Sequence, residues 1–236
     1  MARLTAEQRV QKSHVWLMKN PKYCLYSGIF MIGSTEVKDD VPTACTNGRD
    51  TYYGREFIEK LSETNVRGVI LHENLHKAFR HTTTWFNLYK EHAQLANMAC
   101  DYVINLIIKD IEKSSNGVVT LPKQGLLDEP FRGMDSQQVF DILKQEQQAN
   151  GGGEGDDEGE GMDIHDWADA QGMSEEEKKQ LLKDIDQAIR QGQMAAQKVA
   201  GKGNGGLDRE LAELMAPKVD WREVLREFVK ATCRAK

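Results

Sequence analysis

The stretch of sequence that decides the fold reads Val66-Arg67-Gly68-Val69-Ile70-Leu71-His72-Glu73-Asn74-Leu75-His76. Its apolar residues recur at helical spacing, so we predict a half-buried helix over residues 66–79. On a helix, residues four apart lie on one face, one turn from each other. His72 and His76 can therefore aim two imidazole nitrogens at a single ion.

The chemistry of this pattern points to zinc. Neutral imidazole is a good zinc ligand, and a catalytic zinc site takes three protein ligands and leaves one position for water. In the pattern His-Glu-x-x-His, the glutamate takes a proton from the water that the metal activates and later gives a proton to the leaving amine. We therefore predict His72 and His76 as zinc ligands and Glu73 as the general base. The plainer alternative is a helix whose two histidines lie on the surface or are satisfied in the core.

A third ligand is required, and the next predicted helix, residues 93–112, offers a candidate. Its polar residues Asn97, Asp101 and Asn105 lie four apart in an otherwise apolar segment, so they share one face. A buried carboxylate is costly unless it is paired or binds a metal. We expect Asp101 to be the third ligand and the two asparagines to orient the ligands. An arginine partner or a neighbouring backbone cap would also satisfy the aspartate.

Two histidines compete for the third position. On a continuous helix His81 lies about opposite His72, so it could ligate only if the helix ended before it. The sequence places no glycine between His76 and His81 to make such a turn. His165, in the segment Asp163-Ile164-His165-Asp166-Trp167, is a further open candidate.

The other segments predict an α+β protein that is mostly helical. Helices are expected after the capping box Thr5-Ala6-Glu7-Gln8 as far as residue 19, and over residues 55–62, 136–144, 175–199, 207–215 and 220–231. Aromatic and β-branched residues predict a strand over residues 23–32. The Asn47-Gly48 pair predicts a short hairpin within residues 42–53.

A change of composition divides the chain. Residues 151–161 are only glycine, aspartate and glutamate, which cannot pack and repel one another. We predict a domain over residues 1–148, an acidic Gly-rich linker or disordered loop over residues 149–162, and a helical C-terminal region over residues 163–236.

Composition narrows the class of protein. The net charge of −6 over 236 residues, with no basic cluster, argues against nucleic acid as a partner. No apolar run approaches the ~20 residues of a membrane-spanning helix, and the first residues lack a signal-peptide pattern. Four cysteines without a CxxC pattern indicate free thiols in a reducing compartment. We expect a cytoplasmic protein without a membrane partner.

Several segments together resemble a metallopeptidase domain of bacterial and phage proteins. They are Thr43-Ala44-Cys45-Thr46-Asn47-Gly48-Arg49-Asp50, the histidine helix, Asn97-Met98-Ala99-Cys100-Asp101-Tyr102-Val103-Ile104-Asn105, Phe131-Arg132-Gly133-Met134, His165-Asp166-Trp167 and Asp220-Trp221-Arg222. The resemblance covers nearly the whole chain. It implies a zincin-like fold with a small sheet packed on the HExxH helix, a bound Zn²⁺, and the usual roles for His72, Glu73 and His76. In bacteria this domain often precedes a von Willebrand factor A-like domain. The chain reaches Lys236 without one, so we expect a stand-alone protein of phage or bacterial source.

Two functions follow as hypotheses. The first is a zinc metallopeptidase that hydrolyses a peptide or protein substrate, with an edge strand within residues 44–53 binding the extended chain. The alternative is a non-catalytic, metal-stabilised module that binds a protein partner through its helical C-terminal region or acidic linker. A metal site that serves only folding has no use for a carboxylate at Glu73, so Glu73 favours the enzyme.

Overall fold

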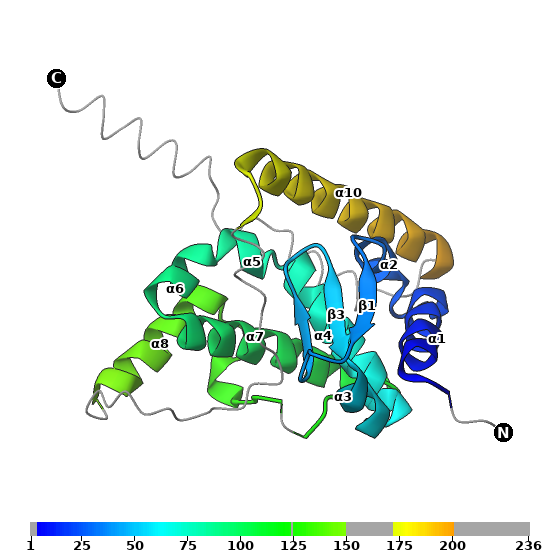
Figure 1. Cartoon of the computed structure of the whole chain (residues 1–236), viewed down its shortest axis with the longest axis horizontal. Helices are drawn as coiled ribbons and strands as arrows, with labels where there is room; N and C mark the ends of the chain where they lie inside the picture. Colours follow the sequence, from blue (N-terminus) through cyan, green and yellow to red (C-terminus); the bar gives the residue numbers. More distant parts are fainter. Residues whose placement is uncertain (1–3, 124, 150–171, 201–236) are drawn as a thin grey trace. The chain divides into compact units, whose positions relative to one another are not determined.

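The histidine helix lies in the interior of the protein. The computed structural model describes residues 4–123, 125–149 and 172–200 (Figure 1). Within it, helix α4 (Glu63–Ala78) has every residue from Val66 to Lys77 buried, so it is covered on all sides rather than half-buried as predicted. It also begins earlier than predicted, because the Ser62 hydroxyl accepts a hydrogen bond from the Asn65 backbone N–H at 3.1 Å and caps the helix.

The predicted class, α+β with mostly helices, is confirmed. The predicted helices appear as α1 (Ala6–Lys19), α3 (Arg55–Lys60), α7 (Ala93–Ser114), α8 (Ser136–Ala149) and α10 (Glu175–Ala200). Two short helices, α5 (His81–Thr84) and α6 (Phe86–Glu91), and a 3₁₀ turn, η2 (Glu129–Phe131), were not predicted. The helices expected over residues 207–215 and 220–231, most of the acidic segment and His165 lie outside the described residues. The proposed domain boundaries stay a prediction.

Three short strands form one small sheet. They are β1 (Thr35–Lys38), β2 (Ala44–Thr46) and β3 (Thr51–Gly54), in the order β1-β3-β2. β3 pairs in parallel with β1 and antiparallel with β2, so the predicted hairpin is confirmed. In its turn, Asn47 Oδ1 accepts hydrogen bonds from the backbone N–H groups of Arg49 and Asp50 at 2.9 and 2.7 Å. β2 forms one edge of the sheet and packs against α4.

The strand predicted over residues 23–32 is wrong. This segment forms a 3₁₀ turn, η1 (Cys24–Tyr26), and a short helix, α2 (Ser27–Phe30). A short apolar run that is buried on all sides cannot be assigned to strand or helix by its periodicity alone. Here tertiary packing decides, since Gly28 lies so close to the α10 backbone that an added Cβ would stand 2.4 Å from the Ala188 carbonyl oxygen. The first strand follows instead at Thr35.

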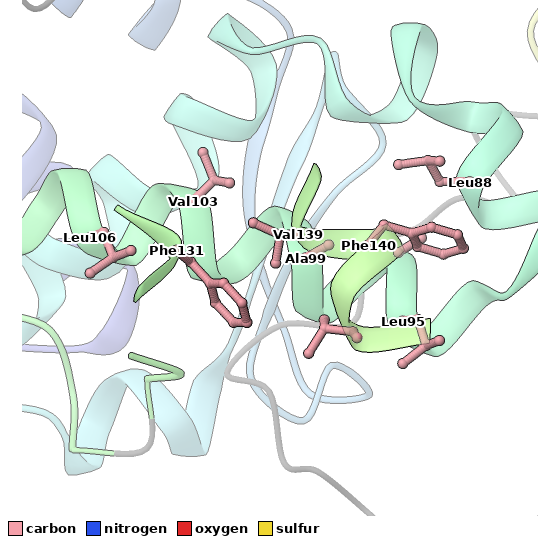
Figure 2. Packing of buried hydrophobic residues seen from close by; sticks show 10 residues of the cluster. Leu88, Leu95, Ala99, Val103, Leu106, Phe131, Val139 and Phe140 are labelled. Carbon is pink, nitrogen blue, oxygen red and sulfur yellow. The ribbon is translucent and has the colours of Figure 1, made fainter. Parts of the chain in front are cut away.

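Apolar packing fixes α7 against α8. The cluster consists of Leu88, Leu95, Ala96, Ala99, Val103, Leu106, Phe131, Val139, Phe140 and Leu143 (Figure 2). The α7 members of the cluster share one face, and Asp101 and Asn105 lie on the roughly opposite face. Because α8 holds the apolar face, α7 directs these two polar side chains towards α4.

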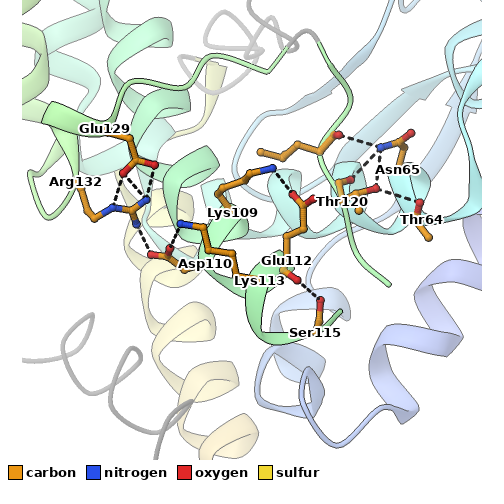
Figure 3. A network of polar contacts seen from close by, with 11 residues as sticks. Thr64, Asn65, Lys109, Asp110, Glu112, Lys113, Ser115, Thr120, Glu129 and Arg132 are labelled. Atoms are coloured by element: carbon orange, nitrogen blue, oxygen red, sulfur yellow. Dashed lines mark hydrogen bonds and ion pairs between the residues drawn. The ribbon is translucent and has the colours of Figure 1, made fainter. Parts of the chain in front are cut away.

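Polar contacts hold the loop after α7 (Figure 3). The Asn65 amide donates to the backbone oxygens of Thr120 and Leu121 at 3.3 and 2.9 Å, and Thr120 Oγ1 donates to Thr64 Oγ1 at 3.0 Å. Further along, Arg132 forms ion pairs with Glu129 and Asp110. The start of α4 is thereby tied to the segment that follows α7.

Helix α10 packs back onto this unit. Ser174 and Glu177 form a capping box at its start, with hydrogen bonds of 2.7 and 3.3 Å between side chain and backbone. Its residues Leu181, Ile185, Ala188 and Ile189 are buried. Asp186 also forms an ion pair with Arg80, which follows the end of α4. Among the described helices, none combines the length and apolar character needed to cross a membrane.

A glycine on α4 provides a test of this packing. A Cβ at Gly68 would stand 2.0 Å from the Thr120 backbone oxygen, whereas one at Gly172 meets no described atom within 4 Å. Gly68→Ala should therefore lower the free energy of unfolding by about 1–3 kcal/mol through overpacking. Gly172→Ala is the control and should change it by less than ~0.5 kcal/mol. Urea denaturation measures both, and equal stability of the two variants would contradict the packing.

A histidine on α1 provides a test by pH. Burial lowers the pKa of His14 from its ordinary 6.5 to about 4, and the nearby Lys77 ammonium adds to the effect. Between these pH values His14 takes up a proton in the unfolded chain but stays neutral in the folded protein. The free energy of unfolding therefore falls as the pH drops from 6.5 to 4. His14→Phe, which can pack against Phe30, removes this contribution. The wild type's stability relative to the variant should fall by roughly 1–3 kcal/mol between pH 7 and 4.5. Urea denaturation at each pH measures the stability of both proteins. If the two stabilities changed in parallel with pH, the low pKa of His14 would be refuted.

Candidate metal centre

Two helices bring three potential ligands to one point. His72 and His76 come from α4 and Asp101 from α7, and all three are no more than 1% exposed. The Nε2 atoms of the histidines are 2.9 Å apart. Asp101 Oδ1 lies 3.4 Å from Nε2 of His76 and 3.6 Å from Nε2 of His72. Within the described residues, these three make up a group whose ligand atoms lie within 4.8 Å of one another.

The spacing of these atoms suits a small metal ion. Zinc binds imidazole nitrogen and carboxylate oxygen at about 2.0–2.2 Å with tetrahedral angles, which places neighbouring ligand atoms about 3.3 Å apart. The three separations observed, 2.9, 3.4 and 3.6 Å, lie around that value. Two nitrogens and one oxygen also leave one tetrahedral position open. The donor set therefore fits a metal ion.

Asn105 orients the first histidine. Its Oδ1 lies 2.9 Å from His72 Nδ1, and its Nδ2 donates to the Leu126 backbone oxygen at 3.0 Å. The second bond fixes which way the amide points, so Oδ1 accepts and His72 Nδ1 carries the proton. The lone pair of His72 is then on Nε2, the atom that faces Asp101. Of the two asparagines expected to orient ligands, Asn105 is fully buried in the site and Asn97 is only partly buried.

His81 is brought to the site by a turn that the sequence did not reveal. Helix α4 ends at Ala78, and Arg80 adopts the left-handed conformation with φ 59° and ψ 36°. This is the conformation that a glycine usually supplies after a helix. The turn places His81 Nδ1 2.8 Å from His76 Nδ1. His81 thus contacts the ring nitrogen of His76 that faces away from His72, rather than the point where the three ligand atoms meet.

Glu73 and a buried lysine complete the surroundings. Glu73 is 1% exposed and lies one residue after His72 on α4. Lys77, one helical turn further on, is also 1% exposed and donates to the Ile32 backbone oxygen at 3.0 Å. Burial lowers the pKa of Lys77 to about 8, against the opposing attraction of the Asp50 and Glu73 carboxylates. In the sequence Lys77 resembles an ordinary exposed lysine. Only its spacing of four residues from Glu73 indicates that the two charged side chains lie on one face of the helix.

Comparison with known proteins identifies the family of this chain. The model of a protein family described as "Putative metallopeptidase domain" matches residues 7–236. No curated protein and no solved structure was found to match the chain. A His/His/Asp group that fits a metal ion agrees with a metal-dependent function for this family. Since the match spans nearly the whole sequence, the chain belongs to this metallopeptidase-domain family.

Proposed function

We propose that the protein is a zinc-dependent peptidase in which His72, His76 and Asp101 hold the ion and Glu73 is the general base. The observation that supports this most is the convergence of the three ligand atoms from α4 and α7, with Glu73 buried one residue after His72. Two nitrogens and one oxygen suit zinc, whereas calcium and magnesium prefer sites made of oxygen alone. The roles of the three ligands and of Glu73 are part of the proposal.

The residues of the site have distinct tasks in such a reaction. Zinc, when bound, would lower the pKa of a water molecule and polarise the carbonyl of the peptide bond. Glu73 would take a proton from that water as the new C–O bond forms. It would then give the proton to the amide nitrogen as the C–N bond breaks. The Lys77 ammonium, attracted to Glu73, would keep negative charge on the base favourable before the reaction.

The substrate proposed is an extended peptide or protein segment. β2 is an edge strand of the sheet and packs against α4, the helix that carries both histidines and Glu73. A peptide could therefore pair with β2 by adding a strand to the sheet. A zincin-like arrangement of this sheet and helix is the fold that the proposal entails.

The competing function is a metal-stabilised module that binds a protein partner without catalysis. Both functions keep the two histidines and Asp101. They differ in their need for Glu73, which is buried one residue after His72 on α4 and which a metal site that serves only folding does not require. A test of Glu73 therefore separates them.

The metal site can be tested by binding. We expect about one Zn²⁺ per chain by elemental analysis, and Asp101→Ala should weaken zinc binding at least about tenfold in competition with a chromophoric chelator. Asp110→Ala is the control, because Asp110 lies on the same helix but pairs with Arg132 on the surface. Wild-type protein that binds no zinc, or equal affinities in the two variants, would contradict the assignment.

The base can be tested by activity. Glu73→Gln removes the proton acceptor but keeps the shape of the side chain, so zinc should stay bound while hydrolysis of a casein or peptide-library substrate falls about 10²–10⁴-fold. The control is Glu63→Gln, on the same helix but half-exposed in an ion pair with Lys12. Wild-type hydrolysis that persists in Glu73→Gln would exclude its role as base. A zinc-loaded wild type that cleaves nothing in the library would favour the non-catalytic module.

A further inference from the structure

We propose that His81 is a positioning residue of the metal centre, which accepts a hydrogen bond from His76 Nδ1 and so holds His76 with its Nε2 lone pair towards the ion. The inference rests on the proposed metal site. It assigns His81 to the support of a ligand and not to the ligand set. The argument comes from the contacts of three buried side chains.

The first contact fixes what His81 must do. A neutral imidazole that ligates through Nε2 carries its proton on Nδ1. His81 Nδ1 faces that atom of His76 at 2.8 Å. Since His76 Nδ1 donates, His81 Nδ1 accepts, and the proton of His81 is on its Nε2.

A second contact provides a hydrogen-bond acceptor for the Nε2–H group of His81. Ser136 Oγ lies 3.3 Å from His81 Nε2 and can accept from it. His81 and Ser136 are 0% and 2% exposed, so each gains from a partner inside the protein. The chain of contacts His76–His81–Ser136 therefore parallels the chain His72–Asn105–Leu126 on the other ligand, with a histidine ring in place of an amide.

The backbone and α10 hold His81 in place. Arg80 adopts the left-handed conformation that turns the chain after α4, and its guanidinium forms an ion pair with Asp186. His81 then begins the short helix α5. The position of the imidazole therefore depends on a turn that a β-branched residue would not tolerate.

Zinc affinity tests the role of His81. His81→Phe should lower the affinity about 10–100-fold, because His76 loses the acceptor that orients it. His81→Asn offers an amide oxygen like that of Asn105 and should recover most of the loss. Equal affinities of the wild type and His81→Phe would overturn the inference and leave the zinc site intact. A wild type that binds no zinc would overturn the proposed function together with it.

Spectroscopy distinguishes a His81 that positions His76 from a His81 that binds the metal directly. Long-range ¹H–¹⁵N NMR of the zinc-loaded wild type should show His81 with its proton on Nε2. A proton on Nδ1 of His81 instead would overturn the inference. The visible spectrum of bound Co²⁺ should be alike in the wild type and His81→Asn. A large change in its intensity would identify His81 as a direct ligand and overturn the inference as well.

The turn offers a matched pair of variants. Arg80→Gly and Arg80→Val both remove the ion pair with Asp186, but only valine is strained in the left-handed conformation. Zinc affinity should be several-fold lower in Arg80→Val than in Arg80→Gly. Equal affinities would show that the position of His81 does not matter to the ion.

Discussion

The rest of the structure depends on the burial of one carboxylate beside two imidazoles. Asp101 and the two histidines are almost inaccessible to solvent, yet their polar atoms meet within hydrogen-bonding or ion-pair distances of one another. Such a group is stable in a protein interior only if its members satisfy each other or share a cation. The packing of α4 and α7 must therefore hold these side chains in contact with one another.

The surrounding elements can be understood as supports for that group. α8 holds the apolar face of α7, and the loop contacts of Asn65 and Thr120 hold the start of α4. β2 packs along α4, and α10 reaches the turn after α4 through Asp186. Segments more than a hundred residues apart in the sequence thus meet around one helix, which explains why this helix is buried on all its sides.

Much of this site could be predicted from the sequence because its residues recur at the spacing of one helical turn. A spacing of four on a helix brings His72 towards His76, and the same spacing singled out Asp101 and Asn105 within an apolar helix. The resemblance to the metallopeptidase-domain family also depends on these segments. Conformation that depends on distant packing was harder to predict. Residues 23–32 have strand-like composition but are helical because they are buried against α10, which comes about 150 residues later. Likewise the lack of a glycine between His76 and His81 gave no sign of the left-handed turn, because Arg80 adopts that conformation and pairs with Asp186.

The near-complete burial of His72, His76 and Asp101 has a kinetic consequence. An ion held by such side chains would leave only when the carboxylate on α7 moves away from the histidines on α4, so its escape would depend on local opening of the protein as well as on affinity. Chelators would then strip the metal at a rate independent of their concentration once they are in excess. Loading of an ion would depend on the same local motion, so it would be coupled to the packing of this core.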